Sequence, residues 1–330
     1  MRAVVVIPTL NACGLLAEAV ASIEAQTVPV EIIVVDNASS DGTVGMLATR
    51  FPRVTVVRNT ENLGFGRAVN RGAAGAGNAD VIILVNNDTV CAPDFVARLL
   101  TPFADPSVGM VAGVLLQGAA ADLIDSAGIE LDTTLGSWDY LWNRPVNALA
   151  AAGDPVGPCG GAAAYRLPVF QELGGFDEML FAYWEDVDLA LRFREAGWRC
   201  VLAADARALH EHGQTIGAAS PAARRLEAFG RGYVLAKYRV GGRSLVRRAM
   251  IAALDWPVLV VHLLVRREPG PARERLRARA LGLRAPAHRA PLELATVGLG
   301  EALRRQTEQL RLRLSGGLPA HFTAGAQGRR

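Results

Sequence analysis

The chain of 330 residues is long enough for one large α/β domain, or for a domain of about 200 residues with a further region attached. Apolar residues make up 51% and aromatic residues only 6%, which argues against disorder and suits a buried sheet covered by helices. Residues before Pro221 carry 13 basic and 25 acidic side chains, whereas the remainder carries 22 and 7. We therefore expect the C-terminal part, at +15, to meet an anionic surface, either phospholipid or nucleic acid.

The N-terminal apolar run and the cysteines bear on the cellular compartment. The run is only six residues long and ends in Pro8, too short for a signal-peptide core, so we interpret it as a strand. The four cysteines are scattered, with no C-x-x-C pair and no His at metal-ligand spacing. A reduced, cytoplasmic setting is expected.

Four short runs rich in β-branched residues alternate with helical patterns and predict βαβ units with a parallel sheet. The runs are residues 3–8, 31–36, 54–58 and 81–86. Polar residues follow each of them: Thr9 and Asn11, then 36–41, then 59–62, then 86–88. Because ligands bind outside the carboxyl ends of such strands, we expect the four polar clusters to converge on one site.

The middle of the chain departs from this repeat. Residues 116–157 lose the periodicity and contain Trp138, Tyr140 and Trp142, which indicates an insertion that lines a cleft. A strand is predicted again at 162–166, and a helix over 184–196 that Gly197 ends.

Beyond Pro221 the pattern is helical and rich in arginine, with an apolar run at 249–265 flanked by arginine pairs. Its 17 residues would reach about 26 Å, short of a bilayer core of about 30 Å, and Asp255 inside it would cost about 3 kcal/mol to insert. We expect either a helix in a membrane interface or an amphipathic helix packed on the first domain. The tail from His321 is predicted to be disordered.

Two loops are candidates for nucleotide contacts. Asp36, at a strand tip, can accept hydrogen bonds from a base edge or a ribose hydroxyl. The structural alternative is that Asp36 closes a turn and Asp41 caps a helix, which for Asp41 is equally expected. The glycines at 64 and 66 lack the third member of a dinucleotide fingerprint. A glycine-rich turn that opens a helix can still bind a diphosphate near Gly64.

A divalent cation is the natural ligand for the polar residues after the fourth run. Asn86, Asn87 and Asp88 offer hard oxygen donors to a cation that also keeps water and substrate phosphates as ligands. His210 would add a borderline ligand that favours manganese, with His212 as a competing choice and a structural role as the alternative for either.

The segment 174–198 places three carboxylates, Glu185, Asp186 and Asp188, in the first turn of a predicted helix. Acidic residues there also complement the helix dipole, so a structural role is the alternative. Phe181, Tyr183 and Trp184 directly precede them and are predicted to form an aromatic wall suited to the apolar face of a sugar. An ionised carboxylate beside a bound hydroxyl can take its proton as that hydroxyl attacks.

Six ordered segments together resemble family 2 glycosyltransferases of the GT-A fold: VVIPTLNA, VVDNASSDGT, ENLGFGRAVNRG, ILVNNDTV, GGFDEMLFAYWEDVDLALRFREAGW and the following His210. The likeness covers roughly residues 3–213 and is greatest to bacterial rhamnosyltransferase-like and galactofuranosyltransferase-like enzymes of cell-envelope polysaccharide synthesis. It implies an α/β GT-A domain with a mainly parallel central sheet at 1–220, followed by a helical, basic region at 221–330. It also implies a hexosyl transfer that inverts the anomeric centre by one in-line displacement, without a covalent intermediate.

The resemblance also assigns roles to residues. It implies Asp186 as catalytic base, Trp184 and Glu185 as acceptor-binding residues, and Asp88 with His210 as ligands of Mg²⁺ or Mn²⁺. The family's acidic metal motif often has two carboxylates, whereas Asn86 occupies the first position here. The residues expected around the nucleotide sugar are Thr9, Asn11, Asp36, Asn37, Asn62, Gly64, Asn70, Asn86, Asn87 and Asp88.

The expected donor is a dTDP- or UDP-linked sugar, with rhamnose as a candidate, and the expected acceptor is a glycan or a polyprenyl-diphosphate-linked hydroxyl. The protein is expected in the cytoplasm, peripheral on the inner face of the plasma membrane. Two alternatives are another nucleotide-dependent transferase, such as a nucleotidyltransferase, and a non-catalytic scaffold that binds nucleotide sugars. Nucleic-acid binding is not expected, because the basic region lacks interleaved aromatic residues and a recognisable module.

Overall fold

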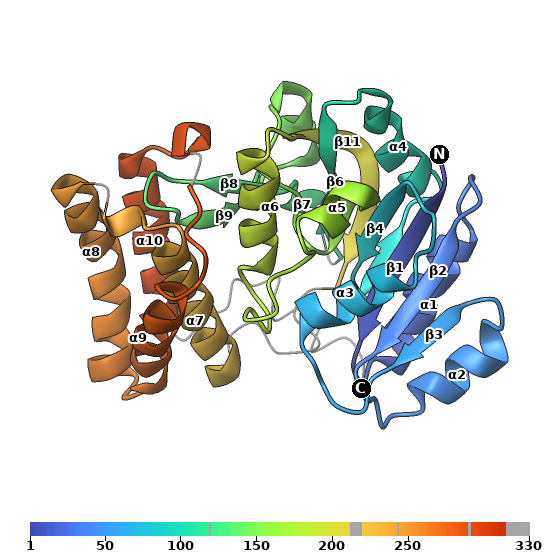
Figure 1. Ribbon diagram of the computed structural model, residues 1–330, viewed down its shortest axis with the longest axis horizontal. Helices are drawn as coiled ribbons and strands as arrows, with labels where there is room; N and C mark the ends of the chain where they lie inside the picture. The colour runs from blue at the N-terminus through green and yellow to red at the C-terminus, as the bar shows by residue number, and fades with distance from the viewer. Residues whose placement is uncertain (119, 212–219, 243, 290–291, 315–330) are drawn as a thin grey trace.

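A computed structural model describes residues 1–118, 120–211, 220–242, 244–289 and 292–314. It confirms the expected α/β fold: helices cover a central sheet, and further helices follow at the C-terminal end (Figure 1). His212 and the tail predicted as disordered lie outside the described residues.

The elements alternate as the sequence predicts through the first half of the chain. The strands are β1 (Ala3–Thr9), β2 (Glu31–Asp36), β3 (Thr55–Arg58), β4 (Val81–Val85), β5 (Thr89–Cys91), β6 (Val108–Gln117), β7 (Ala120–Ser126), β8 (Ile129–Leu131), β9 (Ser137–Asp139), β10 (Ala162–Arg166) and β11 (Arg199–His210). The helices are α1 (Cys13–Glu24), α2 (Thr43–Arg50), α3 (Phe65–Ala74), α4 (Phe95–Leu100), α5 (Leu167–Glu172), α6 (Glu185–Glu195), α7 (Pro221–Lys237), α8 (Leu245–Val260), α9 (Gly270–Gly282) and α10 (Leu299–Leu314).

The first four strands form a parallel block in the order β3-β2-β1-β4. Every residue of β1 is buried, and its side chains alternate between two cores. Val5 packs in the core that α1 and α2 cover, whereas Val4 and Val6 pack in the core that α3 and α6 cover. A continuous run of β-branched residues suits such a strand, because both of its faces are covered by helices.

Beyond β4 the sheet is mixed. β10 runs antiparallel between β4 and β6, and β11 lies parallel to β6 and antiparallel to β5. This arrangement puts His210, the last residue of β11, opposite Thr89 at the start of β5. The fold therefore brings a residue from late in the chain beside the segment that follows β4.

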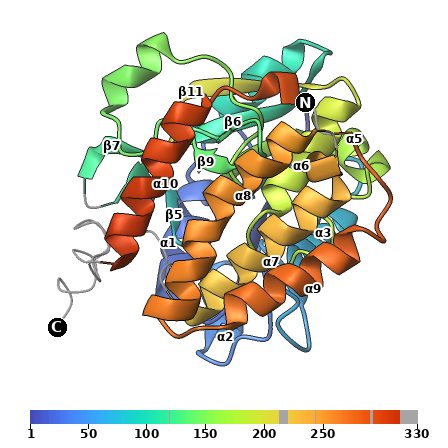
Figure 2. The same ribbon diagram turned by 90° about the vertical axis from the view of Figure 1, so that its left-hand side faces the viewer.

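The C-terminal helices form a layer at the end of the molecule away from β1–β3, with α8 at its outer edge (Figures 1 and 2). Residues on both sides of position 220 share one core, in which Leu131 and Val187 meet Tyr233, Val234 and Ala278. The chain also returns to the insertion, because the backbone amides of Thr296 and Val297 donate to the Leu131 carbonyl oxygen. The helical layer is thus joined to the sheet region by apolar packing and by backbone hydrogen bonds.

Candidate functional site

The polar residues at the tips of β1, β2 and β4 lie against one another. Thr9 is level with Asp36 in the parallel register, and its carbonyl oxygen accepts a hydrogen bond from the Asn37 amide at 2.9 Å. Its hydroxyl accepts another from Asn87 Nδ2 at 3.0 Å. The Asn37 side chain is held in turn by Asn59 Nδ2 at 2.7 Å. The strand ends therefore form one polar surface that backbone register positions.

A cavity of about 1610 Å³ extends from this surface to the C-terminal helices. Ordinary ligand pockets measure about 300–1,000 Å³, so this one has room for two substrates side by side. Its walls also contain the aromatic residues of the predicted insertion, Trp138, Tyr140 and Trp142. The predicted site residues that line it are Thr9, Asn37, Asn62, Gly64, Asn86, Asn87, Asp88, Trp184, Glu185, Asp186 and His210.

Asn11, Asp36 and Asn70 do not line this cavity. Asn11 Oδ1 accepts from the Ser40 amide at 2.8 Å, and Asn70 Oδ1 accepts from the Phe176 amide at 2.8 Å, so both connect loops. Asp36 is 1% exposed; its Oδ1 accepts from the Ser39 amide, whereas its Oδ2 is buried without a hydrogen-bond partner. Nucleotide binding by these three residues stays a prediction.

Asp41 accepts backbone hydrogen bonds at the start of two helices, α1 and α2. Its carboxylate accepts hydrogen bonds from the amides of Thr43, the first residue of α2, and of Cys13. Although burial opposes the effect, a hydrogen bond from the Thr43 hydroxyl, together with those from the Cys13 and Thr43 amides, lowers the pKa of Asp41. The structural alternative given for Asp41 thus accounts for its contacts.

Gly64 allows two walls of the cavity to approach each other. It has a φ of +83°, and a Cβ added there would collide with the Phe181 carbonyl oxygen. The same carbonyl accepts a hydrogen bond from the Phe65 amide at 2.8 Å. Only glycine tolerates both this φ and this contact without strain, so the loop before α3 can lie directly against the aromatic wall.

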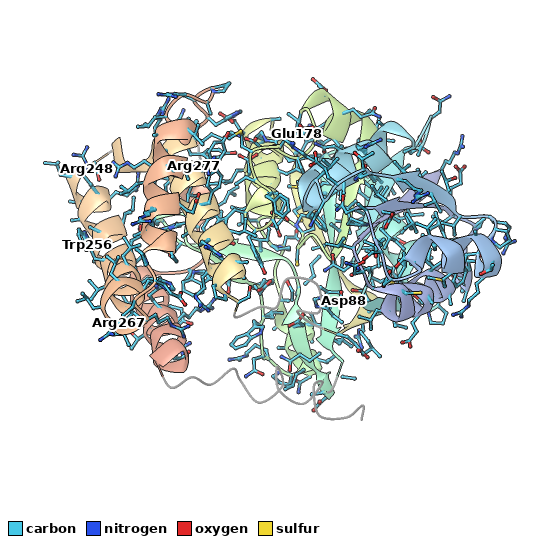
Figure 3. The ribbon with its side chains drawn as sticks, turned by 90° about the horizontal axis from the view of Figure 1, so that it is seen from below. Asp88, Glu178, Arg248, Trp256, Arg267 and Arg277 are labelled. Atoms are coloured by element: carbon cyan, nitrogen blue, oxygen red, sulfur yellow. The ribbon has the colours of Figure 1, made fainter. Side chains whose placement is uncertain are left out.

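Asp88 and His210 meet at the base of the cavity, and Figure 3 shows Asp88 near the middle of the molecule, between the sheet and the helical end. His210 Nε2 lies 3.2 Å from Asp88 Oδ1, and its Nδ1 lies 2.7 Å from Asp125 Oδ2. Although burial opposes the effect, the two carboxylates raise the pKa of His210 to about 10. A carboxylate on the far nitrogen of an imidazole fixes the ring orientation, as it does for metal-binding histidines.

The Asp88–His210 pair has the geometry of two neighbouring ligands of one cation. Ligands about 2.1 Å from a metal and at right angles lie about 3 Å apart, close to the separation of this oxygen and nitrogen. Within the described part of the chain, no three His, Cys, Asp or Glu side chains form a group that could hold a metal ion. Asp88 and His210 would therefore share a cation with substrate phosphates and water.

Asp186 projects into the cavity from the first turn of α6. Its Oδ2 accepts from the Gly160 amide at 3.3 Å and its Oδ1 accepts from the Val187 amide at 2.8 Å. Burial raises the pKa of Asp186, and burial together with the charge of Asp186 raises the pKa of Glu185. A carboxylate with a raised pKa and a fixed orientation is suited to accept a proton from a bound hydroxyl.

Asp188, two residues further along α6, has different surroundings. It is fully buried and forms ion pairs with Arg192 at 2.8 Å and Lys237 at 2.7 Å. The structural alternative thus fits Asp188, because it joins α6 to α7.

The backbone just before α6 is strained. Tyr183 and Trp184 have φ values of 67° and 75°, which residues with a Cβ seldom adopt. The Trp184 ring lies under the Arg231 guanidinium, whose Cζ is 5.6 Å from the ring centroid. Such strain persists where surrounding contacts enforce it, often at functional sites.

Two residues at this site, Asp125 and Arg231, were not expected from the sequence. Asp125 contacts His210 across 85 positions and lies in the segment without periodicity. Arg231 lies in the basic region, lines the cavity and donates to the Thr134 carbonyl oxygen at 2.9 Å. A buried carboxylate partner for a metal-ligand histidine is a general expectation, but nothing in the sequence identifies which carboxylate it is.

The family described as "Glycosyl transferase family 2" matches residues 4–174. The chain is 32% identical over 212 residues to the N-acetylglucosaminyl-diphospho-decaprenol L-rhamnosyltransferase of Mycobacterium tuberculosis, which covers 57% of this chain and 69% of that protein. It is 29% identical over 222 residues to the O-antigen chain rhamnosyltransferase RfbN of Salmonella typhimurium, covering 65% of this chain and 68% of that protein.

Solved structures share the fold. The mannosyltransferase PcManGT of Pyrobaculum calidifontis, in complex with GDP-Man and Mn²⁺, superposes with a TM-score of 0.56 at 23% identity and covers 98% of this chain and 86% of its own. GalNAc-T7 with UDP, GalNAc and Mn²⁺ gives a TM-score of 0.60 at 17% identity over 77% of this chain and 50% of its own. These are glycosyltransferases of the GT-A fold, as expected from the sequence.

Proposed function

Since the chain belongs to glycosyl transferase family 2 and is a glycosyltransferase, we propose that it transfers a sugar, with rhamnose as the first candidate, from a nucleotide diphosphate to an acceptor hydroxyl with inversion. The acceptor we propose is a glycan or a polyprenyl-diphosphate-linked sugar of cell-envelope polysaccharide synthesis. The observation that carries the proposal is that Asp186 lines the same cavity as the polar strand tips and the Asp88–His210 pair. The two rhamnosyltransferase relatives support the choice of sugar.

The donor would bind at the sheet end of the cavity. Thr9, Asn37 and Asn62 offer hydroxyl and amide groups to the nucleoside of a dTDP- or UDP-linked sugar. Gly64 lies on the same wall, directly before α3, and the positive end of a helix dipole favours a diphosphate.

Asp88 and His210 would hold a divalent cation, Mg²⁺ or Mn²⁺. When bound, such a cation supplies charge neutralisation on a leaving diphosphate. Asp125 would keep His210 Nε2 directed at the site through its bond to Nδ1.

Asp186 would act as the general base. The acceptor hydroxyl oxygen attacks the anomeric carbon on the face opposite the nucleotide, a new C–O bond forms, and the bond to the diphosphate oxygen breaks. The hydroxyl proton passes to Asp186, whose carboxylate the Gly160 and Val187 amides orient. One displacement inverts the anomeric centre, and the nucleoside diphosphate leaves with the bonding electrons.

The acceptor would occupy the helical end of the cavity. Trp184 offers an aromatic surface there, and Glu185 lies beside Asp186 with its Oε2 buried and without a hydrogen-bond partner. Six arginines from the C-terminal region line this end, most of them in ion pairs with carboxylates, and guanidinium groups are suited to bind an acceptor with phosphate groups. The arginines are Arg224, Arg231, Arg266, Arg275, Arg304 and Arg305. With such an acceptor, we propose that the enzyme acts in the cytoplasm, peripheral on the inner face of the plasma membrane.

Calorimetric titration with UDP, dTDP and GDP and their sugar conjugates, each with and without Mn²⁺, tests the donor half of the proposal. We expect tight, cation-dependent binding of dTDP or UDP. The absence of binding to every nucleotide would favour a non-catalytic scaffold. The acceptor half is tested by transfer from the bound donor to a polyprenyl-diphosphate-linked N-acetylglucosamine.

A further inference from the structure

Helix α8 continues through a π-helical turn (Val261–Val265) and turns its apolar side outward. The exposed positions recur every three or four residues, so they form one stripe along the helix. Val246, Trp256 and Leu264 in this stripe are 71%, 62% and 73% exposed. The stripe, which we call the α8 outer face, consists of Val246, Ala249, Ala253, Trp256, Val260 and Leu264.

Two polar side chains in the middle and at the end of the same helix point toward the protein. Asp255 forms ion pairs with Arg275 of α9 and, at 3.5 Å, with Arg231 of α7. His262 is 3% exposed. A surface helix of a water-soluble protein normally has the opposite orientation, with the polar side in water. The α8 outer face is therefore built for a non-aqueous neighbour.

Basic residues lie at both ends of this face. Arg248 is exposed near the beginning of α8 and Arg267 just after its end, and both lie with Trp256 along the outer edge of the molecule (Figure 3). The neighbouring helix α9 exposes Arg273 and Arg277. Arginines beside an exposed apolar stripe match an anionic phospholipid surface, in which the guanidinium groups meet phosphates and the apolar groups enter the acyl boundary.

We propose that the α8 outer face is a docking surface for an anionic phospholipid bilayer, in which α8 lies in the plane of the interface. The segment Leu245–Val265 is long and apolar enough to cross a membrane, longer than the run recognised in the sequence. A crossing would nevertheless place Asp255 in hydrocarbon and break its ion pairs with Arg275 and Arg231. An interfacial position keeps these pairs and buries the exposed stripe.

The opposite side of α8 from the α8 outer face lines the cavity, which connects membrane docking with the proposed transfer reaction. Leu254, Val258 and Leu259 line the cavity that contains Asp186. One helix would thus separate the bilayer from the acceptor end of the cavity, within reach of a lipid-linked acceptor. This consequence rests on the proposed function, whereas bilayer binding does not.

Co-sedimentation with vesicles tests the surface, using phosphatidylcholine alone and phosphatidylcholine mixed with phosphatidylglycerol. We expect the wild-type protein to bind the mixed vesicles preferentially. Arg248→Gln with Arg267→Gln should weaken that binding about 30-fold, since each arginine near the surface contributes about 1 kcal/mol. Trp256→Glu with Leu264→Glu should weaken it about 100-fold, because two large apolar side chains no longer enter the interface. The matched control is Arg53→Gln with Arg71→Gln, two exposed arginines on the sheet side, and it should bind as the wild type does.

The fluorescence of Trp256 can also show whether this side chain enters the bilayer. Brominated lipids should quench part of the tryptophan fluorescence of the wild type, and Trp256→Phe should abolish that part. Wild-type protein that ignores anionic vesicles, or α8 variants that bind as well as the control pair, would overturn the proposal. Light scattering gives a further test. The proposal would also be overturned if the wild-type protein formed a dimer that dissociates in the Trp256→Glu, Leu264→Glu variant and did not bind vesicles.

Calorimetric nucleotide binding, measured on every variant, separates this proposal from the proposed function. Intact nucleotide binding without vesicle binding refutes the docking surface alone. Vesicle binding without any nucleotide binding refutes the proposed donor site alone.

Discussion

The two ends of the cavity are built in different ways. At the sheet end, short uncharged side chains form hydrogen-bonded pairs, Asn87 with Thr9 and Asn59 with Asn37, and the parallel register of β1 and β2 positions their backbone. At the helical end, long charged side chains meet in pairs, such as Arg224 with Glu268 and Arg305 with Glu130. Short groups on strands lose little freedom when a ligand binds, whereas long arginine side chains can rearrange around it.

This difference suggests a division between a preorganised donor end and an adaptable acceptor end. A donor that carries a conserved chemical unit, a nucleoside diphosphate, suits rigid polar contacts. Glycan acceptors differ in size and linkage, and flexible cations with aromatic surfaces can follow their shapes. The predictions below test that division.

The largest effect should come from Asp186, which lies where the two ends meet. Asp186→Asn removes the proton acceptor and should lower kcat by about 10² to 10⁴-fold, because general bases contribute about that much. Donor binding should be unchanged, since the nucleotide would contact the sheet end. Nucleoside diphosphate release with acceptor present measures the first quantity and calorimetry the second; near-normal turnover would remove Asp186 from the base role.

Asp188 should affect the fold of the helical end instead of the chemistry. Asp188→Asn leaves Lys237 and Arg192 with less charge compensation in a buried place, which should destabilise the protein by about 3–5 kcal/mol. Urea unfolding followed by circular dichroism measures this change. Glu195→Gln on the same helix is the matched control: its partner His288 is partly exposed, so the cost should stay below about 1 kcal/mol. Equal losses for both variants would contradict the anchoring role of Asp188.

At the sheet end, Asp125 should act through His210. Asp125→Asn should weaken Mn²⁺ affinity about 10 to 100-fold, as expected when the partner of a metal-binding histidine is changed. Titration of Mn²⁺ in the presence of nucleoside diphosphate measures the affinity, and Asp125→Glu should restore part of it. Unchanged Mn²⁺ affinity in Asp125→Asn, with an unchanged thermal midpoint, would argue that His210 needs no orienting carboxylate.

The sheet end could be predicted from sequence because strands are local patterns. The structure places β2 and β10 at the predicted residues and ends β1 one residue later, and register then brings Thr9 beside the residues after β2 and β4. The helical end could not be predicted, because its pairs join residues such as Glu130 and Arg305, which are 175 positions apart. Asp186 and Asp188 likewise look alike in sequence, and only tertiary contacts distinguish them.

The smallest effect should be a shift in the pH dependence at the junction of the two ends. Burial raises the pKa of Asp186 above its ordinary value of 3.8, and the base must be ionised to act. kcat should therefore fall as pH decreases through the raised pKa, with a midpoint above 3.8. Initial rates at saturating donor give this midpoint, and nucleotide binding at each pH excludes unfolding as the cause. Asp186→Glu should move the midpoint, whereas Arg53→Gln, far from the cavity, should not. A midpoint at or below 3.8 would mean that water reaches Asp186 as freely as it reaches the protein surface, and burial at the junction of the two ends would then have no effect on the base.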